Sequence, residues 1–150
     1  MVSITDMSAS AKKFGAVYEA WMHPVCAKTG MPLTALCIFM YFANNPDKNT
    51  AQQLCDERGY KRAIVSMHVE MLVQKGLLRR VGVEGDRRKW GLVCTEKAEP
   101  VINEARALQK SFGDAIIAGL TEEDLEKMEE YFNKLRGNLD SMSAELASSK

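Results

Sequence analysis

Residues 50–94 decide the fold and have the sequence TAQQLCDERGYKRAIVSMHVEMLVQKGLLRRVGVEGDRRKWGLVC. Thr50 is followed three residues later by Gln53, the pattern of a capping box, in which two side chains satisfy free backbone N–H groups. The segment therefore opens with a short helix, expected over residues 51–57.

A second helix is expected directly after it, over residues 61–75. Ile64, Val65, Val69, Leu72 and Val73 form its apolar face, and Gly76 stands where a helix commonly ends. Gly59-Tyr60 supplies a tight turn between the two helices. Two short helices joined in this way predict a helix-turn-helix.

A β-hairpin should follow the second helix. Residues 77–81 and 89–94 have strand character, and the glycine-bounded, charged segment 82–88 lies between them. A hairpin in this place is a wing, so the segment is predicted to be a winged helix-turn-helix.

Helices are also expected on both sides of this segment. They should cover about residues 8–28, with a kink or interruption near His23 caused by Pro24, then 33–44, and 96–118 with an irregular first turn at Pro100. The fold class is thus mainly α with a small β-hairpin wing, in a single domain over residues 1–150.

The last helix should begin at Thr121 and carry one long apolar stripe. Its members are Leu125, Met128, Phe132, Leu135, Leu139, Met142 and Leu146. A single domain of this length needs no such helix for its own core, so a subunit interface is the favoured interpretation and an intramolecular fold-back the alternative. We expect about residues 33–95 to form a DNA-binding lobe, and about 8–28 and 96–146 to form dimerisation helices.

Charge is unevenly distributed in a chain whose net charge is zero. Residues 58–90 contain nine Lys or Arg and three acids, a net charge of +6, whereas residues 91–150 carry −5 and residues 1–57 carry −1. This concentration predicts a polyanionic partner for the basic segment alone.

Other classes of function find little support in the sequence. No P-loop, Rossmann glycines, GxSxG or HExxH occurs, so no enzyme, catalytic residue or cofactor is predicted. The four cysteines form no CxxC and no metal site is expected. The N-terminus lacks the apolar region of a signal peptide and no segment is long enough to cross a membrane, which favours the cytoplasm.

The order of elements resembles the multiple-antibiotic-resistance regulator (MarR) family of winged-helix transcription factors over about residues 10–140. The segments IVSMHVEMLVQKGLLRR (64–80) and GDRRKWGLVCTEKA (85–98) carry most of the resemblance. Asp86-Arg87-Arg88 matches the family's Asp-x-Arg wing motif, whereas Met67 stands where the family often has Arg. The resemblance implies a homodimer that binds a pseudo-palindromic DNA operator.

The DNA-contacting residues are predicted in two groups. The first lies off the apolar face at the start of the second helix, the part of a recognition helix that enters the major groove: Lys61, Arg62, Ala63, Ser66 and Met67. The second lies in the wing: Asp86, Arg87, Arg88 and Lys89. By the family match, Arg88 enters the minor groove and Asp86 orients it, while Arg87 and Lys89 contact phosphates.

The resemblance also implies a small-molecule pocket between the DNA-binding lobe and the dimerisation helices. Its candidate lining residues are Trp21, His23, Cys37, Tyr41 and Phe112. An effector bound there would release the DNA, so a repressor controlled by an effector is the favoured function.

Two alternatives remain open at this stage. Cys26, near His23 and Lys28, or Cys55, near Arg58, could make the chain a thiol-based redox-sensing regulator. A winged-helix module that binds protein is the second alternative, although the basic wing favours DNA.

Overall fold

The computed structural model describes residues 3–83 and 85–149, without the side chains of residues 86–88. The chain divides into two compact units, residues 1–112 and 113–150. The elements in order are α1 (Ile4–Thr29), α2 (Leu33–Asn44), α3 (Ala51–Arg58), α4 (Arg62–Gln74), β1 (Leu78–Val83), β2 (Asp86–Cys94), the 3-10 turn η1 (Glu96–Ala98), α5 (Glu99–Ile116) and α6 (Glu122–Ser148). The predicted fold class, mainly α with a β-hairpin wing, is confirmed.

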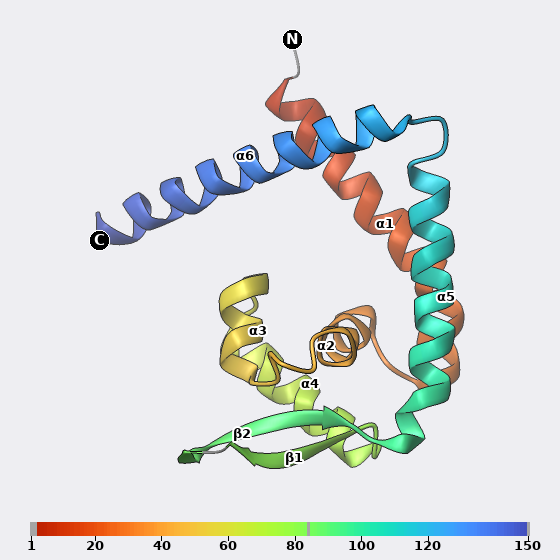
Figure 1. The fold of residues 1–150 in the computed structure, drawn as a ribbon, viewed down its shortest axis with the longest axis vertical. Helices are drawn as coiled ribbons and strands as arrows, with labels where there is room; N and C mark the ends of the chain where they lie inside the picture. The colour runs from red at the N-terminus through yellow and green to blue at the C-terminus, as the bar shows by residue number, and fades with distance from the viewer. Residues whose placement is uncertain (1–2, 84, 150) are drawn as a thin grey trace. The chain divides into compact units, whose positions relative to one another are not determined.

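Helix α2 forms the centre of the first unit's core. Figure 1 views it end-on, and it packs against α1, α4 and β2. Seven of its twelve residues are buried, among them Leu36, Ile38 and Phe39. The helix is apolar nearly all round because neighbours cover it on several sides.

The helix-turn-helix is built as the sequence predicts. The Thr50 hydroxyl accepts a hydrogen bond from the Gln53 backbone N–H at 3.3 Å, and the Gln53 side chain accepts one from the Thr50 N–H at 3.1 Å. Gly59 then adopts φ 69°, a left-handed conformation that lets α3 end and the chain turn into α4.

The hairpin is fastened to the start of α3. β1 and β2 pair antiparallel, with Arg80 opposite Leu92 and Gly82 opposite Trp90. The Leu92 N–H donates to the Asn49 carbonyl at 2.7 Å, and Thr50 forms a further bridge with Gly91. A Cβ at Gly91 would lie 2.8 Å from the Asn49 side-chain amide, so a larger residue would require that side chain to shift.

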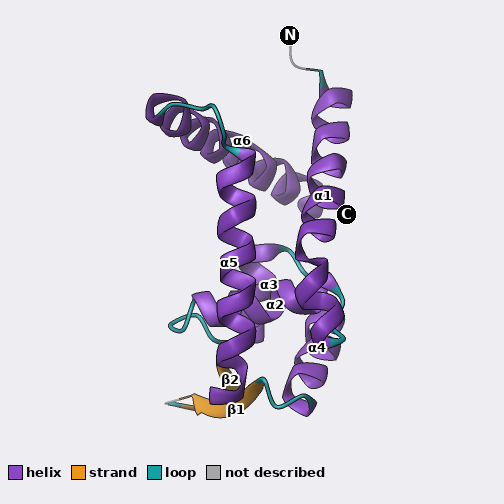
Figure 2. Ribbon diagram, turned by 90° about the vertical axis from the view of Figure 1, so that its right-hand side faces the viewer, coloured by secondary structure: helices purple, strands orange, loops and turns teal. Residues whose placement is uncertain are grey.

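Within the first unit, α1 and α5 run side by side, as Figure 2 shows. The Gln109 amide donates to the Tyr18 hydroxyl at 3.0 Å, and the Trp21 indole N–H donates to the Ser111 hydroxyl at 3.0 Å. The Phe112 ring makes edge contacts with those of Phe14, Tyr18 and Trp21. The flanking helices of the winged helix are thereby joined to each other.

Two sequence-based expectations are corrected by the helices. Pro24 does not interrupt α1, which runs unbroken from Ile4 to Thr29. Its neighbours Met22 and Val25 are fully buried, and we attribute the unbroken helix to this packing, which offsets the hydrogen bond that proline cannot make. In α4, Ile64 is 38% exposed instead of lying in the core, and His68 is buried on the apolar face in addition to the residues expected there.

The second unit contains α6. A capping box opens it, because the Thr121 hydroxyl and the Asp124 carboxylate each accept a hydrogen bond from the other residue's backbone N–H. No described residue of α6 is buried. The predicted apolar stripe includes Phe132, Leu139 and Leu146, all of which are exposed.

The described residues contain neither a single membrane-spanning helix nor a metal-ligating cluster. No single helix there is long and apolar enough to span a membrane, although α1 and α2 taken together, bent by 87° at their junction, satisfy length and composition. No three His, Cys, Asp or Glu of the described part of the chain converge on a possible metal position.

Candidate nucleic-acid interface

The exposed end of α4 holds one predicted group of DNA contacts. Its inner face is buried through Val65, His68, Val69 and Leu72. This packing turns the remaining N-terminal side chains outward, and all five predicted there are exposed: Lys61, Arg62, Ala63, Ser66 and Met67. The structure therefore brings the first predicted group together on one surface.

The electrostatics of this helix end favour an anion. Lys61 occupies the N-cap position without a side-chain cap, and the first turn contains no acid. The positive end of the helix dipole and its free N–H groups consequently face solvent. The Arg62 guanidinium donates to the Gln52 side-chain oxygen, a neutral acceptor that holds the cation without cancelling its charge.

A groove of about 740 Å³ separates α4 and the start of α3 from the hairpin. Its lining residues are Thr50, Ala51, Gln52, Gln53, Arg62, Ser66, Val69, Arg80, Val83, Lys89, Trp90 and Leu92. Three of them are cationic and none of these twelve is acidic. The groove is thus a positively charged channel beside the exposed end of α4.

Arg80 of β1 pairs with Glu70 of α4. Its guanidinium lies 2.7 Å from the Glu70 carboxylate of α4. This hydrogen bond is the largest cause that lowers the pKa of Glu70. The ion pair is solvent-exposed, so its contribution to stability is small, but it helps to orient the cation at the groove.

Of the predicted wing residues, Lys89 is exposed and lines the groove together with Arg62 and Ser66. The side chains of Asp86, Arg87 and Arg88 lie outside the described residues, although their backbone belongs to β2. Their roles at the DNA stay predictions.

The sequence analysis missed Trp90, Arg80 and Gln52 as members of this surface. Strand alternation could have signalled Trp90, since it lies two residues before the buried Leu92. No comparable signal exists for Gln52, because its contact with Arg62 depends on how α3 and α4 cross.

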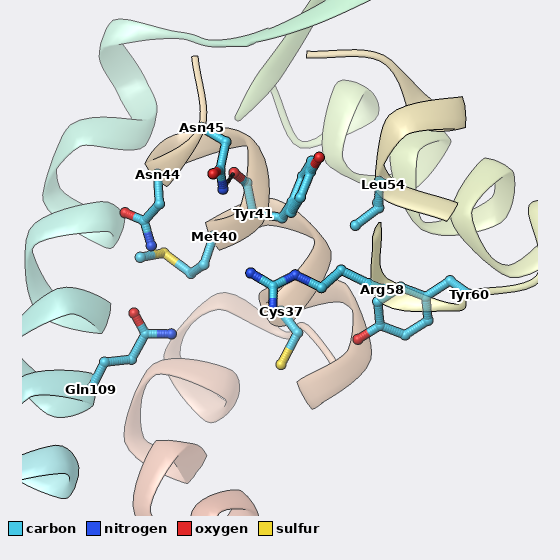
Figure 3. A pocket seen from close by; sticks show the side chains of 9 residues that line it. All are labelled: Cys37, Met40, Tyr41, Asn44, Asn45, Leu54, Arg58, Tyr60 and Gln109. Carbon is cyan, nitrogen blue, oxygen red and sulfur yellow. Dashed lines mark hydrogen bonds between the residues drawn. The ribbon is translucent and has the colours of Figure 1, made fainter. Parts of the chain in front are cut away.

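A second pocket, of about 290 Å³, lies among α2, α3 and α5 (Figure 3). Its lining residues are Cys37, Met40, Tyr41, Asn44, Asn45, Leu54, Arg58, Tyr60 and Gln109. Of the predicted effector residues, the pocket brings together Cys37 and Tyr41. Trp21 and Phe112 pack on one another between α1 and α5, and His23 is exposed on α1, so these three do not line it.

Arg58 contributes a cationic side chain to the lining of this pocket. Its guanidinium lies 5.8 Å from the centre of the Tyr41 ring. Figure 3 shows its side chain extending across the pocket between Tyr41 and Tyr60. The Tyr41 hydroxyl donates to the Glu57 carboxylate at 3.1 Å, and Glu57 in turn pairs with Lys48 at 2.7 Å. Glu57 is thereby engaged with Lys48 and Tyr41 instead of forming an ion pair with Arg58.

Cys26, Cys37 and Cys94 show no sign of an activated thiolate. Burial raises the pKa of Cys26, of Cys37 and of Cys94. A raised pKa keeps these thiols protonated at neutral pH, which is unfavourable for reaction with an oxidant.

Comparison with known proteins gives the family. Residues 29–89, the segment from the end of α1 to the wing, match the model of the MarR family. This part of the chain is similar to the MarR family. The matched segment contains α2, the helix-turn-helix and Lys89 of the groove.

Solved structures of similar fold cover most of the chain. A transcriptional regulator shares 20% identity, with a TM-score of 0.79 over 91% of this chain and 97% of its own. A MarR regulator from Listeria monocytogenes, solved with a 26-mer DNA, shares 14% sequence identity, with a TM-score of 0.78 over 93% of this chain and 89% of its own. CouR from Rhodococcus jostii, solved with p-coumaroyl-CoA, shares 15% sequence identity, with a TM-score of 0.73 over 87% of this chain and 91% of its own. At these identities the likeness shows a common fold.

Proposed function

We propose that this chain is a MarR-family transcriptional regulator that binds double-stranded DNA. The observation that carries the proposal is the exposed, uncapped and cationic end of α4 beside a groove with no acid in its lining. Arg62 can donate two hydrogen bonds to a guanine edge, and Ser66 can reach a base or a phosphate. Ala63 and Met67 can contact a thymine methyl group.

The wing completes the proposed interface. Lys89 contributes a phosphate contact, Arg87 a second, and Arg88, oriented by Asp86, enters the adjacent minor groove. The Listeria relative, solved with DNA, supports this use of the fold.

The regulator acts as a homodimer in this proposal. Residues 33–95 form the DNA-binding lobe, and residues 8–28 and 96–146 form the dimerisation helices. The exposed apolar stripe on α6 supports an interface, since a monomer would leave Phe132, Leu135 and Leu139 in water. Two recognition helices then contact half-sites about 10 base pairs apart, or a multiple of that.

A homodimer on an operator represses by blocking polymerase, and an effector releases it. The pocket among α2, α3 and α5 supports this step, because a ligand there contacts both the helix-turn-helix and α5. Arg58 favours an effector with an anionic group, and the tyrosines favour an aromatic body. Release requires that the ligand bind the DNA-free state more tightly than the bound one.

The decisive experiment is selection of duplexes from a random pool, followed by fluorescence anisotropy titrations on a selected duplex. Arg62→Gln should weaken specific binding by about 1–3 kcal/mol. Lys12→Gln, which removes an exposed cation of α1, is the matched control and should bind as the unaltered protein does.

Failure of the unaltered protein to bind any duplex in dilute salt would refute the proposal. That result would favour the protein-interaction alternative. Peroxide-driven release that is lost in Cys26→Ser would instead favour thiol-based sensing.

A further inference from the structure

Trp90 is an exposed aromatic side chain with no role in the interface described so far. It is 58% exposed, and no ring or cation of the described residues stacks on its indole. Trp21, the other tryptophan of the chain, is instead held by a hydrogen bond to Ser111 and by contact with Phe112. Exposing so large an apolar surface has a cost in water unless a partner covers it.

The hairpin fixes the position of Trp90 in the groove. Leu92, two residues later on the same face of β2, is buried, and Trp90 continues that face into the groove lining. Gly82 lies opposite Trp90 and has no side chain to cover the indole. The hydrogen bond from Leu92 to Asn49 fastens this part of β2 to the start of α3. The indole is therefore held on a braced strand.

The chemistry of the groove matches a sugar-phosphate backbone. One part of its lining is cationic, through Arg62, Arg80 and Lys89. Another part is apolar, through Val83, Trp90 and Leu92. A nucleic-acid strand presents the same two surfaces, because its phosphates are anionic and its deoxyriboses are largely apolar. Arg80 shares its charge with Glu70, so it attracts phosphate less strongly than an unpaired guanidinium would.

The position of the groove favours duplex DNA over other anionic partners. Arg62 and Ser66 belong both to the exposed end of α4 and to the groove lining. A duplex that receives the end of α4 in its major groove must pass one backbone strand over the adjacent groove.

We propose that the groove between α4 and the hairpin seats one strand of the DNA backbone, and that Trp90 packs on a deoxyribose of that strand. The inference rests on the proposed DNA binding and adds a contact to it. Such a contact positions the protein on the duplex without selecting a base sequence.

Intrinsic fluorescence tests the contact directly, because the chain has only two tryptophans. Trp21→Phe leaves Trp90 as the only indole, and Trp90→Phe leaves Trp21. Both variants are titrated with a 30-base-pair duplex of random sequence in dilute salt, and anisotropy of a dye-labelled copy of the same duplex reports binding independently. The emission of Trp90 should change and saturate in step with binding, whereas the emission of Trp21 should stay constant.

Affinity measurements give a second readout. Trp90→Ala should weaken binding about tenfold on both selected and random duplexes, since the contact is independent of sequence. The slope of affinity against salt should be unchanged, because no charge is removed. Lys89→Gln, which removes a proposed phosphate contact, should instead reduce that slope by about one. Circular dichroism confirms that each variant is folded.

The outcomes separate the contact from the proposed function. If the protein binds duplex DNA while the Trp90 emission is constant and Trp90→Ala binds normally, the contact is refuted and DNA binding stands. If Trp90→Ala loses affinity for selected duplexes only, Trp90 contributes to base recognition, and its proposed contact with the DNA backbone is refuted. If the protein binds no duplex, both proposals fail.

Discussion

Helices α2 and α6 both carry large apolar side chains, yet these side chains have opposite surroundings. Leu36 of α2 is 1% exposed, whereas Leu139 of α6 is 64% exposed. The difference follows from their patterns, since α2 is apolar nearly all round and α6 carries a single stripe. A helix of the first kind is covered by its own chain, while a helix of the second kind can stay exposed until a partner covers it.

The largest expected effect is on the covered helix. Leu36→Ala should lower the free energy of unfolding by about 3 kcal/mol, because the mutation leaves a cavity among fully packed neighbours. Urea denaturation measures this change. Ile4→Ala, at a side chain that is 79% exposed, is the control and should change stability by less than about 0.5 kcal/mol. If Leu36→Ala lowered the free energy of unfolding by less than about 0.5 kcal/mol, α2 would not be the packed centre of the core.

The next effect tests whether α6 is covered by a second copy. Leu139→Asp should raise the dimer dissociation constant about 100-fold, because the interface would bury an unpaired carboxylate. Sedimentation across a range of protein concentrations measures this shift. Ser141→Asp places the same charge away from the stripe and should leave association unchanged. A dimer that tolerates Leu139→Asp would exclude the stripe as its interface.

A smaller effect is expected at the first turn of α6. Thr121→Ala removes the hydroxyl that accepts the Asp124 N–H at 3.2 Å, which should cost about 1 kcal/mol of local stability. Hydrogen exchange at the Asp124 amide should accelerate about fivefold as a result. Thr121→Ser keeps the acceptor oxygen and should exchange at the original rate. Equal exchange in all three proteins would mean that the cap does not hold this end.

The smallest effect is chemical and concerns the thiols of the covered region. Burial raises the pKa of Cys37 in α2. Because only the thiolate is alkylated, Cys37 should react with iodoacetamide more slowly than free cysteine at pH 7, and its rate should rise with pH until pH passes the raised pKa. Mass spectrometry of the labelled peptide measures the rate. Fast labelling of Cys37 at pH 7 would show that burial does not suppress its thiolate.

Local signals in the sequence were sufficient to locate most of the helices and turns. The Thr50–Gln53 and Thr121–Asp124 pairs located two helix starts, and Gly59 and Gly76 located two turns. Each signal depends on residues within about four positions of one another, so no knowledge of the tertiary fold is needed. The irregular entry to α5 was likewise predicted from Pro100 and is present as η1.

Where the sequence analysis was wrong, packing between distant segments overrode a local rule. Met22 and Val25 pack around the Pro24 turn, and α1 continues. The burial of His68 and the exposure of Ile64 both depend on the direction from which α2 approaches α4. Periodicity defines an apolar face but leaves its edges to the neighbouring elements.

The sequence alone determined that this chain has a helix-turn-helix, a hairpin and a basic surface at the start of α4, because capping, glycine turns and charge are local properties. Only the tertiary structure decided that Trp90, Arg80 and Gln52 share a groove with Arg62, and that Arg58 lines a pocket with Cys37 and Gln109. Those groupings join residues from different elements, and their distances follow from how the hairpin is fastened to Asn49 and how α5 packs beside α2.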